Sequence, residues 1–243
     1  MGARGTRPRE ELPQDGGSPA GGRRRGTSGG RVTRFGLIRH AETLWNRQRR
    51  IQGRGDSPLT PEGKRMAAFW GRLLAGLPWD RILASDTGRA LATARRIQAR
   101  LGRPLALEPR LRELDWGAWT GRTLEEIAAV EPERLARQAA AGWEFRPPGG
   151  ESRRELLARV RAALAAAARR HPGERVLVVT HGGVLRALEL SLSGDGPPAA
   201  EAPDPRGYRI LWVRGGPEGR LELEGVCPLG GTGAARVRRE AAS

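Results

Sequence analysis

The sequence predicts an α/β protein, a three-layer α/β/α sandwich with a mainly parallel central sheet. Three observations support this fold class. Short apolar runs alternate along the chain with longer segments whose apolar residues recur at helical spacing. Two capping boxes, at 123–126 and 152–155, each mark the start of a helix. The apolar run Val176–Val179 has no polar interruption, which is typical of a strand covered by helices on both faces.

Each element follows from its local pattern. Thr60 can cap a helix that has Pro61 at its first position, and the helix after Ser152 should run to Arg170, before the turn His171-Pro172-Gly173. The strands at the end of the chain are expected to be edge strands. In chain order, the sequence predicts strands at 33–38, 81–84, 176–179, 208–213 and 221–226, and helices from 61, over 88–101, from 123, over 152–170 and over 184–192.

Large apolar residues concentrate in the middle of the chain. Residues 1–31 are rich in Gly, Pro and Arg and cannot bury enough surface to offset the entropy of ordering, so we expect a disordered N-terminal segment. The composition predicts a similar flexible C-terminal tail over 231–243, which leaves one domain at 32–230. No apolar run approaches the roughly 20 residues of a membrane span, and no secretory signal is evident. With a single cysteine, Cys227, these features predict a cytoplasmic protein without a membrane partner.

The chain is strongly basic, with 43 Lys and Arg against 27 Asp and Glu and a formal net charge of +16. Lys64 is the only lysine, and such a bias toward arginine is also typical of proteins encoded by GC-rich genomes. A basic surface can attract nucleic acid or phosphorylated metabolites. Because no helix-turn-helix, zinc-finger or RNA-recognition signature is present, we expect no nucleic-acid partner. A basic nucleic-acid-binding protein is the alternative from a different functional class.

Polar residues follow three of the predicted strands. Arg39-His40 ends the first, Ser85 ends the second with Arg89 soon after it, and Thr180-His181-Gly182-Gly183 ends the third. In open α/β sheets, ligands bind outside the carboxyl ends of the strands, where helix N-termini add backbone N–H donors. The sequence therefore predicts an anion pocket at this edge of the sheet.

The segment Arg39-His40-Ala41-Glu42-Thr43, with Asn46, resembles the signature of the histidine phosphatase superfamily, also called the phosphoglycerate mutase-like family. Further blocks follow in that family's order, and the resemblance covers about 35–190. It implies the phosphoglycerate mutase-like form of the α/β sandwich. The blocks are Gln52-Gly53 with Asp56 and Pro58-Leu59-Thr60, Ser85 with Arg89-Ala90 and Thr93-Ala94, Leu111-Arg112-Glu113 with Gly117, Trp119 and Gly121, Pro148-Gly149-Gly150-Glu151-Ser152, and Val178-Val179-Thr180-His181-Gly182-Gly183.

The resemblance implies roles for five catalytic residues. His40 matches the nucleophile, which forms a phosphohistidine, and imidazole suits this role because it is largely neutral near pH 7. Arg39 and Arg89 match the arginines that clamp the phosphoryl oxygens with their planar forks. His181 matches the second histidine, expected to be protonated and to donate to the transferring group. These cations would replace a metal, so neither a metal nor a cofactor is expected.

Glu113 matches the family's acid/base residue, which protonates the leaving oxygen and then activates water. Asp115 lies on the same short segment and is its competitor. Some relatives carry an aspartate directly after the second histidine, but Gly182 occupies that place here.

Four further residues are expected to bind phosphate or substrate: Asn46, Gln52, Gly53 and Gly182. Two of them have a structural alternative. Asn46 could equally cap a local turn, and Gln52-Gly53 could belong to a flexible turn with Arg54 and Gly55.

The expected activity is hydrolysis of a small phosphorylated metabolite. The alternative is a phosphoglycerate mutase, which uses the same intermediate but returns the phosphoryl group to its product. Cofactor-dependent mutases carry a long basic insertion that excludes water, whereas the stretch 122–148 is short, so hydrolysis is favoured. A homodimer is one option for a fold of this kind.

Overall fold

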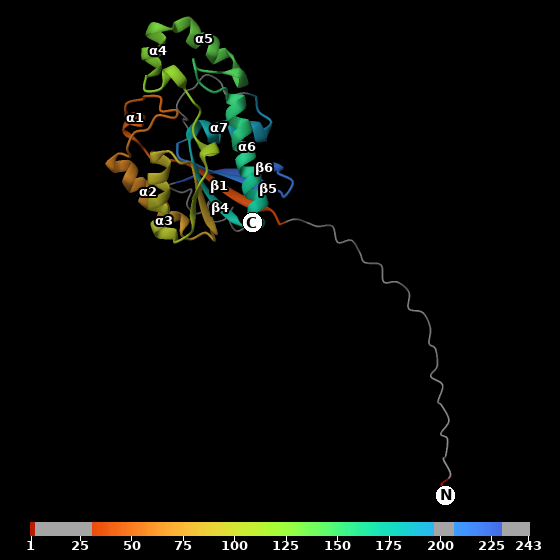
Figure 1. Cartoon of the computed structure of the whole chain (residues 1–243). Helices are drawn as coiled ribbons and strands as arrows, with labels where there is room; N and C mark the ends of the chain where they lie inside the picture. The colour runs from red at the N-terminus through yellow and green to blue at the C-terminus, as the bar shows by residue number, and fades with distance from the viewer. Residues whose placement is uncertain (3–30, 197–206, 230–243) are drawn as a thin grey trace.

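The computed structural model describes residues 1–2, 31–196 and 207–229. Its core is a six-stranded sheet in the order β3-β2-β4-β1-β5-β6 (Figure 1). The first four of these strands run parallel, β5 is antiparallel to β1, and β6 is antiparallel to β5. The predicted mainly parallel sheet is confirmed. The strands are β1 (Thr33–Arg39), β2 (Arg81–Ala84), β3 (Leu105–Leu107), β4 (Arg175–Thr180), β5 (Arg209–Gly215) and β6 (Leu221–Pro228).

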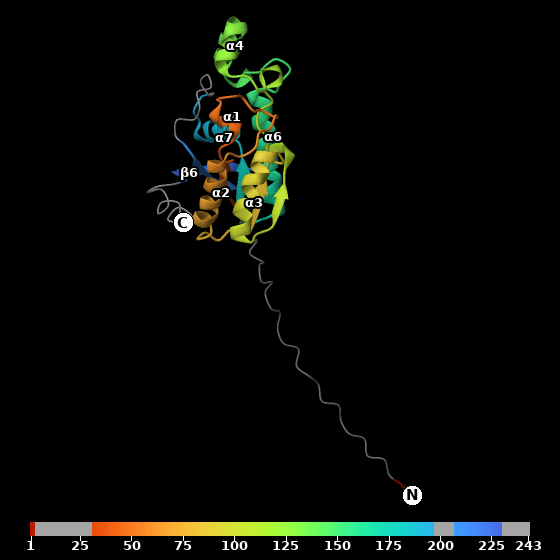
Figure 2. The same ribbon diagram turned by 90° about the vertical axis from the view of Figure 1, so that its left-hand side faces the viewer.

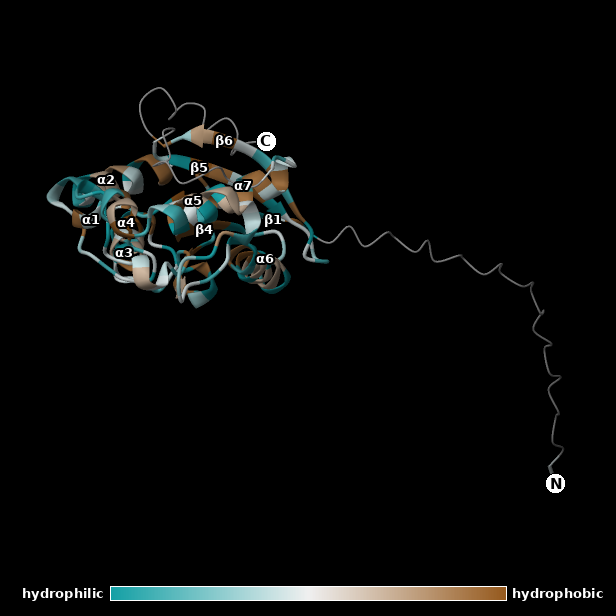
Figure 3. Ribbon diagram, turned by 90° about the horizontal axis from the view of Figure 1, so that it is seen from above, coloured by the Kyte–Doolittle hydropathy of each residue, from teal (hydrophilic) through white to brown (hydrophobic). Residues whose placement is uncertain are grey.

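Helices cover both faces of the sheet, as the predicted sandwich requires. α2 (Pro61–Leu74) and α3 (Gly88–Leu101) pack on one face, and α6 (Arg153–Arg170) and α7 (Gly182–Ser193) pack on the other (Figure 1). Strand β4 shows why: Val176 and Val178 belong to the core cluster under α6, whereas Leu177 and Val179 belong to the one under α2 and α3. In Figure 3 much of the brown, hydrophobic colour lies along strands inside the molecule, and many outer loops are teal.

Shorter helices lie around the carboxyl ends of the parallel strands. α4 (Leu124–Val130) and α5 (Pro132–Ala140) form the top of the molecule in Figure 1, and Figure 2 shows α4 projecting from it. α1 (Leu44–Arg47) follows β1. Three turns of 3-10 helix cover Pro109–Leu111, Gly117–Trp119 and Gly142–Glu144.

The helix starts agree with their capping residues. Thr60 Oγ1 accepts from the backbone N–H of Gly63 at 2.8 Å, and both predicted capping boxes form at Thr123 and Ser152. A third box, between Thr43 and Asn46, opens α1. Each such cap contributes about 1 kcal/mol by satisfying backbone donors that the helix leaves unpaired.

Some sequence predictions are corrected. The strand expected at the edge over 208–213 is β5, which pairs with both β1 and β6 and so lies inside the sheet. One edge is instead β3, which has only three residues, two of them exposed, and therefore no clear apolar pattern. α7 begins at Gly182 and not at Val184, since two glycines, which are poor helix formers, hide its first turn.

Apart from residues 1, 2 and 31, the segments 1–31 and 231–243, predicted to be disordered and flexible, lie outside the described residues. None of the helices in the described part combines the length and the apolar composition needed to cross a lipid bilayer.

Candidate active site

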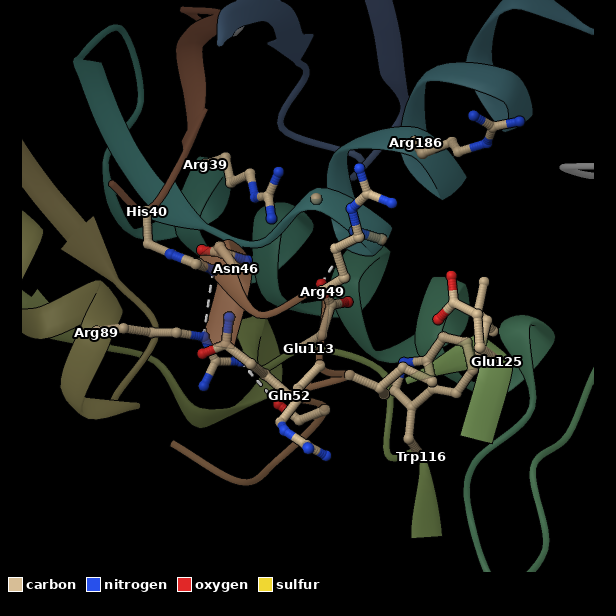
Figure 4. Close-up of a pocket in the computed structure, with 16 residues that line it drawn as sticks. Arg39, His40, Asn46, Arg49, Gln52, Arg89, Glu113, Trp116, Glu125 and Arg186 are labelled. Carbon is tan, nitrogen blue, oxygen red and sulfur yellow. Dashed lines mark hydrogen bonds between the residues drawn. The ribbon is translucent and has the colours of Figure 1, made fainter. Parts of the chain in front are cut away.

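All of the predicted site residues except His181 line one cleft at the carboxyl ends of the parallel strands, and His181 is buried behind it, beside His40. The volume of the cleft is about 580 Å³, which suits a small metabolite. We call the end at His40 and Arg89 the inner end, and the part of the cleft that extends from Arg49 to Glu125 and Arg186 the outer end (Figure 4). The lining residues are Arg39, His40, Asn46, Arg49, Arg50, Ile51, Gln52, Gly53, Arg89, Glu113, Trp116, Leu124, Glu125, Gly182, Gly183 and Arg186.

His40 directly follows β1 and is 2% exposed. Its Nδ1 lies 2.8 Å from the carbonyl oxygen of Ala41, and since a carbonyl can only accept, Nδ1 carries the hydrogen. Nε2 then accepts from Nε of Arg89 at 3.2 Å. Burial, followed by the charges of Arg39 and Arg89, holds the pKa of His40 well below its usual value. The ring is therefore neutral near pH 7, and its Nε2 carries the lone pair that a nucleophile needs.

His181 directly follows β4 and lies beside His40, with the ring centroids 5.3 Å apart and the ring planes at 62°. Its Nε2 is 2.9 Å from the hydroxyl oxygen of Ser85, at the end of β2. Burial, then the charge of Arg89 above other neighbours, holds the pKa of His181 well below its usual value. Burial and neighbouring cations thus favour the neutral imidazole in the absence of a phosphoryl group, whereas the sequence prediction of a protonated His181 concerns the ring while it donates to that group. A phosphoryl dianion beside the ring would favour the protonated form.

Arg89 lies in the first turn of α3 and is 1% exposed. Its Nη2 donates to the carbonyl of Gly53 at 2.7 Å, and its Nη1 donates to the carbonyl of Gly55 at 2.6 Å and to Asp56 Oδ1 at 3.1 Å. One edge of the guanidinium is thus fixed to the loop 53–56. The Nε–H and one N–H of Nη2 share the other edge, which faces His40, and these can bind a phosphoryl oxygen.

Three buried polar atoms near the inner end have no hydrogen-bond partner in the described part of the chain. They are Nε of Arg39, Oε1 of Gln52 and Nδ1 of His181. A buried polar atom without a partner costs free energy, and because Arg39 and Gln52 line the cleft, a ligand there could supply their missing partners. The guanidinium of Arg39 also lies 6.0 Å from the centre of the Tyr208 ring.

Glu113 is held at the N-terminus of α7. Its Oε2 accepts from the backbone N–H of Gly183 at 3.0 Å, and its Oε1 accepts from the N–H of Leu114 at 2.9 Å. Asp115, the competitor, does not line the cleft: it accepts from the N–H of Gly117 at 2.9 Å and forms an ion pair with Arg54. The structure thus places Glu113, and not Asp115, on the wall beside the two histidines.

The other predicted residues also line the cleft. Asn46 fulfils the alternative role too, since its Oδ1 accepts from the backbone N–H and the hydroxyl of Thr43 in the capping box of α1. Gly53 has a φ of +52°, a left-handed conformation that favours glycine, and its carbonyl holds Arg89. Gly182 opens α7, where its backbone N–H lies among donors without intrahelical partners.

Sequence reasoning missed most of the outer end. Arg49, Leu124, Glu125 and Arg186 line the cleft but had no predicted role in binding. In a chain with 43 basic residues, composition does not distinguish one arginine from another. The capping box at 123–126 places Glu125 in the first turn of α4, but it does not reveal that this turn faces the cleft. In residues 31–196 and 207–229, no three His, Cys, Asp or Glu side chains gather as a set that could hold a metal ion.

Two buried imidazoles, two arginines and a carboxylate at the strand ends of an α/β sandwich define a protein of phosphoryl-transfer chemistry. The model of the histidine phosphatase superfamily (branch 1) matches residues 35–211, and the chain belongs to this superfamily. It is therefore an enzyme of the phosphatase type, and the resemblance seen in the sequence motifs is confirmed.

Similar proteins include both phosphatases and a mutase by name. A probable phosphoglycerate mutase, GpmB, of Salmonella choleraesuis (strain SC-B67) is 42% identical over 159 residues, which are 65% of this chain and 74% of the relative. The solved structure of Bacillus stearothermophilus YhfR superposes with a TM-score of 0.68 at 32% identity and covers 79% of this chain and 95% of its own. A mycobacterial glucosyl-3-phosphoglycerate phosphatase complexed with VO3 has a TM-score of 0.66 at 28% identity, covering 79% and 97%.

Proposed function

We propose that the protein is a metal-independent phosphomonoesterase that hydrolyses small phosphorylated metabolites through a phosphohistidine on His40. The observation that carries this proposal is the pairing at the inner end. There the neutral His40 ring directs Nε2 at the guanidinium of Arg89, and His181 lies beside it. A nucleophilic nitrogen thus lies next to the cation that would bind the phosphoryl group it attacks.

In the first step, Nε2 of His40 attacks phosphorus and the bond between phosphorus and the ester oxygen breaks. Arg39, the edge of Arg89 that faces His40 and the backbone N–H groups at the start of α7 would hold the phosphoryl oxygens. The phosphoryl dianion would raise the pKa of His181 and make it a further donor. Glu113, in its acid form, gives its proton to the leaving alkoxide.

In the second step, water attacks phosphorus on the side opposite the His40 ring. Glu113, now a carboxylate, takes a proton from that water, and the nitrogen–phosphorus bond breaks. Inorganic phosphate leaves, and both His40 and Glu113 return to their starting states. The charge that a metal would neutralise in other phosphatases is met here by guanidinium groups, an imidazolium and backbone N–H donors.

Trapping the intermediate tests this proposal. The enzyme is mixed with p-nitrophenyl phosphate, quenched without acid, and analysed by mass spectrometry for a phosphoryl adduct on His40. We expect the adduct during turnover, and we expect His40→Ala to abolish both the adduct and turnover while keeping the folded circular dichroism spectrum. Turnover should persist in a chelator. Active enzyme that never carries the adduct, or strict dependence on an added divalent metal, would contradict the mechanism.

A phosphoglycerate mutase is the second candidate, since the 42%-identical relative carries that name as a probable activity. Hydrolysis is favoured because the stretch 122–148 is short and brings only Leu124 and Glu125 to the cleft wall. Water can then compete for the phosphoenzyme. Product analysis with 3-phosphoglycerate separates the two: a phosphatase releases inorganic phosphate, whereas a mutase yields 2-phosphoglycerate with little phosphate release.

A further inference from the structure

The outer end of the cleft contains two arginine side chains that form no hydrogen bond or ion pair with the described residues. The guanidinium groups of Arg49 and Arg186 make no hydrogen bond or ion pair within the described residues, although both residues line the cleft. Their neighbour Arg50 shows the contrast, since it donates to both carboxylate oxygens of Glu126 and to the carbonyl of Gly121. Arg50 thus has a carboxylate partner that hydrogen-bonds to it, whereas the guanidinium groups of Arg49 and Arg186 have none in the described residues.

Arg49 occupies a strained backbone position. It is the only non-glycine residue with positive φ in the described part of the chain, at +54°. It directly follows Gln48, the C-cap of α1, a place where helices usually put glycine because other side chains fit poorly there. A residue kept in such a conformation is a candidate for a functional role. In this conformation, the side chain of Arg49 lines the cleft (Figure 4).

Arg186 is placed by helix α7. It lies four residues after Gly182, on the same face of the helix, so it is about 6 Å further along the axis than the turn that meets the phosphoryl group. Its Nε is buried and has no hydrogen-bond partner in the described residues. An unpartnered buried donor at this distance from the inner end indicates a second polar group on the ligand.

One carboxylate opposes these cations. Glu125, in the first turn of α4, lines the same end of the cleft and is exposed. Two guanidinium groups against one carboxylate leave the outer end with a net positive charge. An anionic substituent would therefore gain from Arg49 and Arg186, while Glu125 would reduce that gain.

We propose that Arg49 and Arg186 form a second anion subsite, so that the preferred substrates are phosphomonoesters bearing a further carboxylate or phosphate. This inference rests on the proposed function, because the inner end must hold the phosphoryl group that is removed. Arg49 and Arg186 bind the substituent that stays on the product, and Glu125 limits how strongly they bind it. The subsite determines specificity and takes no part in bond breaking.

Matched ligands test the subsite. Glycerol 3-phosphate and 3-phosphoglycerate differ by one carboxylate, and fructose 6-phosphate and fructose 1,6-bisphosphate differ by one phosphate. Each is measured as a competitive inhibitor of p-nitrophenyl phosphate hydrolysis, and its dissociation constant is also measured by calorimetry in a His40→Asn background. We expect the extra anion to tighten binding about tenfold in at least one pair, and the pair that responds identifies the anion.

Charge-matched variants show whether the subsite is responsible. Arg49→Gln should reduce the preference to about twofold or less. The control Arg47→Gln removes the same charge from an exposed arginine that pairs with Glu42 and does not line the cleft, and it should keep the preference. Glu125→Gln should increase the preference two- to threefold. Hydrolysis of p-nitrophenyl phosphate, which has no second anion, should change less than twofold in the Arg47→Gln control.

Two results overturn the subsite: no preference in the wild-type protein, or equal losses in the Arg49→Gln and Arg47→Gln variants. Neither result affects the phosphatase proposal as long as p-nitrophenyl phosphate is hydrolysed through the His40 adduct. Conversely, a calorimetric preference that depends on Arg49, in a protein without turnover, would retain the subsite and reject the proposed function.

Discussion

Arg159 donates a hydrogen bond of 2.9 Å from Nη2 to the backbone carbonyl of Glu113. Its Nη1 donates to the carbonyls of Arg110 and Arg112, at 2.7 Å each. The guanidinium is itself held by Glu151, which accepts from Nε at 2.6 Å and from Nη2 at 2.7 Å. Through this one side chain, helix α6 supports the segment that presents Glu113 to the cleft.

Replacing Arg159 should therefore misplace Glu113. Arg159→Lys keeps a charge but cannot reach three carbonyls, so we expect kcat for alkyl phosphates to fall about tenfold or more, since small displacements of catalytic groups are costly. Hydrolysis of p-nitrophenyl phosphate, whose leaving group needs little protonation, should fall less. The unfolding free energy should also drop, because lysine cannot make the bidentate contact with Glu151 together with the hydrogen bonds to the carbonyls. Equal losses for both substrates would assign Arg159 a purely structural role.

The acid role of Glu113 predicts a dependence on the leaving group. Glu113→Gln keeps the shape of the side chain but cannot donate a proton as an acid, so kcat should fall 10²- to 10⁴-fold for alkyl phosphates. Activated aryl phosphates should lose much less. A plot of log kcat against leaving-group pKa measures this difference. Parallel plots for the wild-type and variant proteins would point to another acid, and Asp115→Asn is the matched control.

Glycine at position 183 gives Glu113 its place at the helix N-terminus. A Cβ there would lie 2.5 Å from Glu113 Oε1, so Gly183→Ala should push the carboxylate aside and weaken the 3.0 Å hydrogen bond. We expect kcat to fall more for alkyl phosphates than for activated aryl phosphates, as in Glu113→Gln. At Gly182 a Cβ would come no closer than 3.4 Å to Arg39, so Gly182→Ala should cost clearly less. A larger loss at 182 than at 183 would contradict this account.

The two buried histidines predict a pH dependence of stability. Both have a folded-state pKa well below the ordinary value of about 6.5, so below that pH the unfolded chain binds protons that the folded chain does not. Stability is then complete above about pH 6.5 and falls as the pH is lowered through that value toward the folded-state pKa. Two histidines give a limiting slope of about 2.7 kcal/mol per pH unit.

Urea unfolding at pH 7.5, 6.5 and 5.5 measures this slope. His40→Asn and His181→Asn should each remove about half of it. His171, whose pKa is also lowered, chiefly by burial, is the internal comparison, and His171→Asn should change the slope less because the residue is only partly buried. Stability that stays level down to pH 5.5 would show that the rings protonate readily in the folded protein.

The sequence predicted the inner end of the cleft better than the outer end. His40, Arg89, Glu113 and His181 belong to motifs of fixed spacing, and parallel strands bring their carboxyl ends to one edge of the sheet. The protonation state of His181 could not be predicted, because it depends on burial and on charges from other segments. Nor could the fixed edge of Arg89, whose partners are mostly backbone carbonyls that any sequence possesses.

The fold was predictable for similar reasons. Long amphipathic helices and buried strands carry strong patterns, whereas β3 carries almost none in its three residues. The position of β5 inside the sheet could not be predicted from local periodicity. Periodicity indicates that a segment is a strand, but it does not indicate which strands lie next to it in the sheet. Arg49 lines the cleft because of its positive φ, and Glu125 does so because of where α4 lies. No sequence motif predicts either feature.

One edge of the Arg89 guanidinium donates hydrogen bonds to the carbonyls of Gly53 and Gly55, and the other edge faces His40. A metabolite that shifts this loop on entering must therefore also shift the guanidinium and, through it, the imidazole of His40. How well a molecule fits at the loop would then affect the speed of chemistry as well as the strength of association. Esters that fit the loop poorly should therefore bind but have a low kcat. Part of the selectivity among substrates then arises in the chemical step and not in binding.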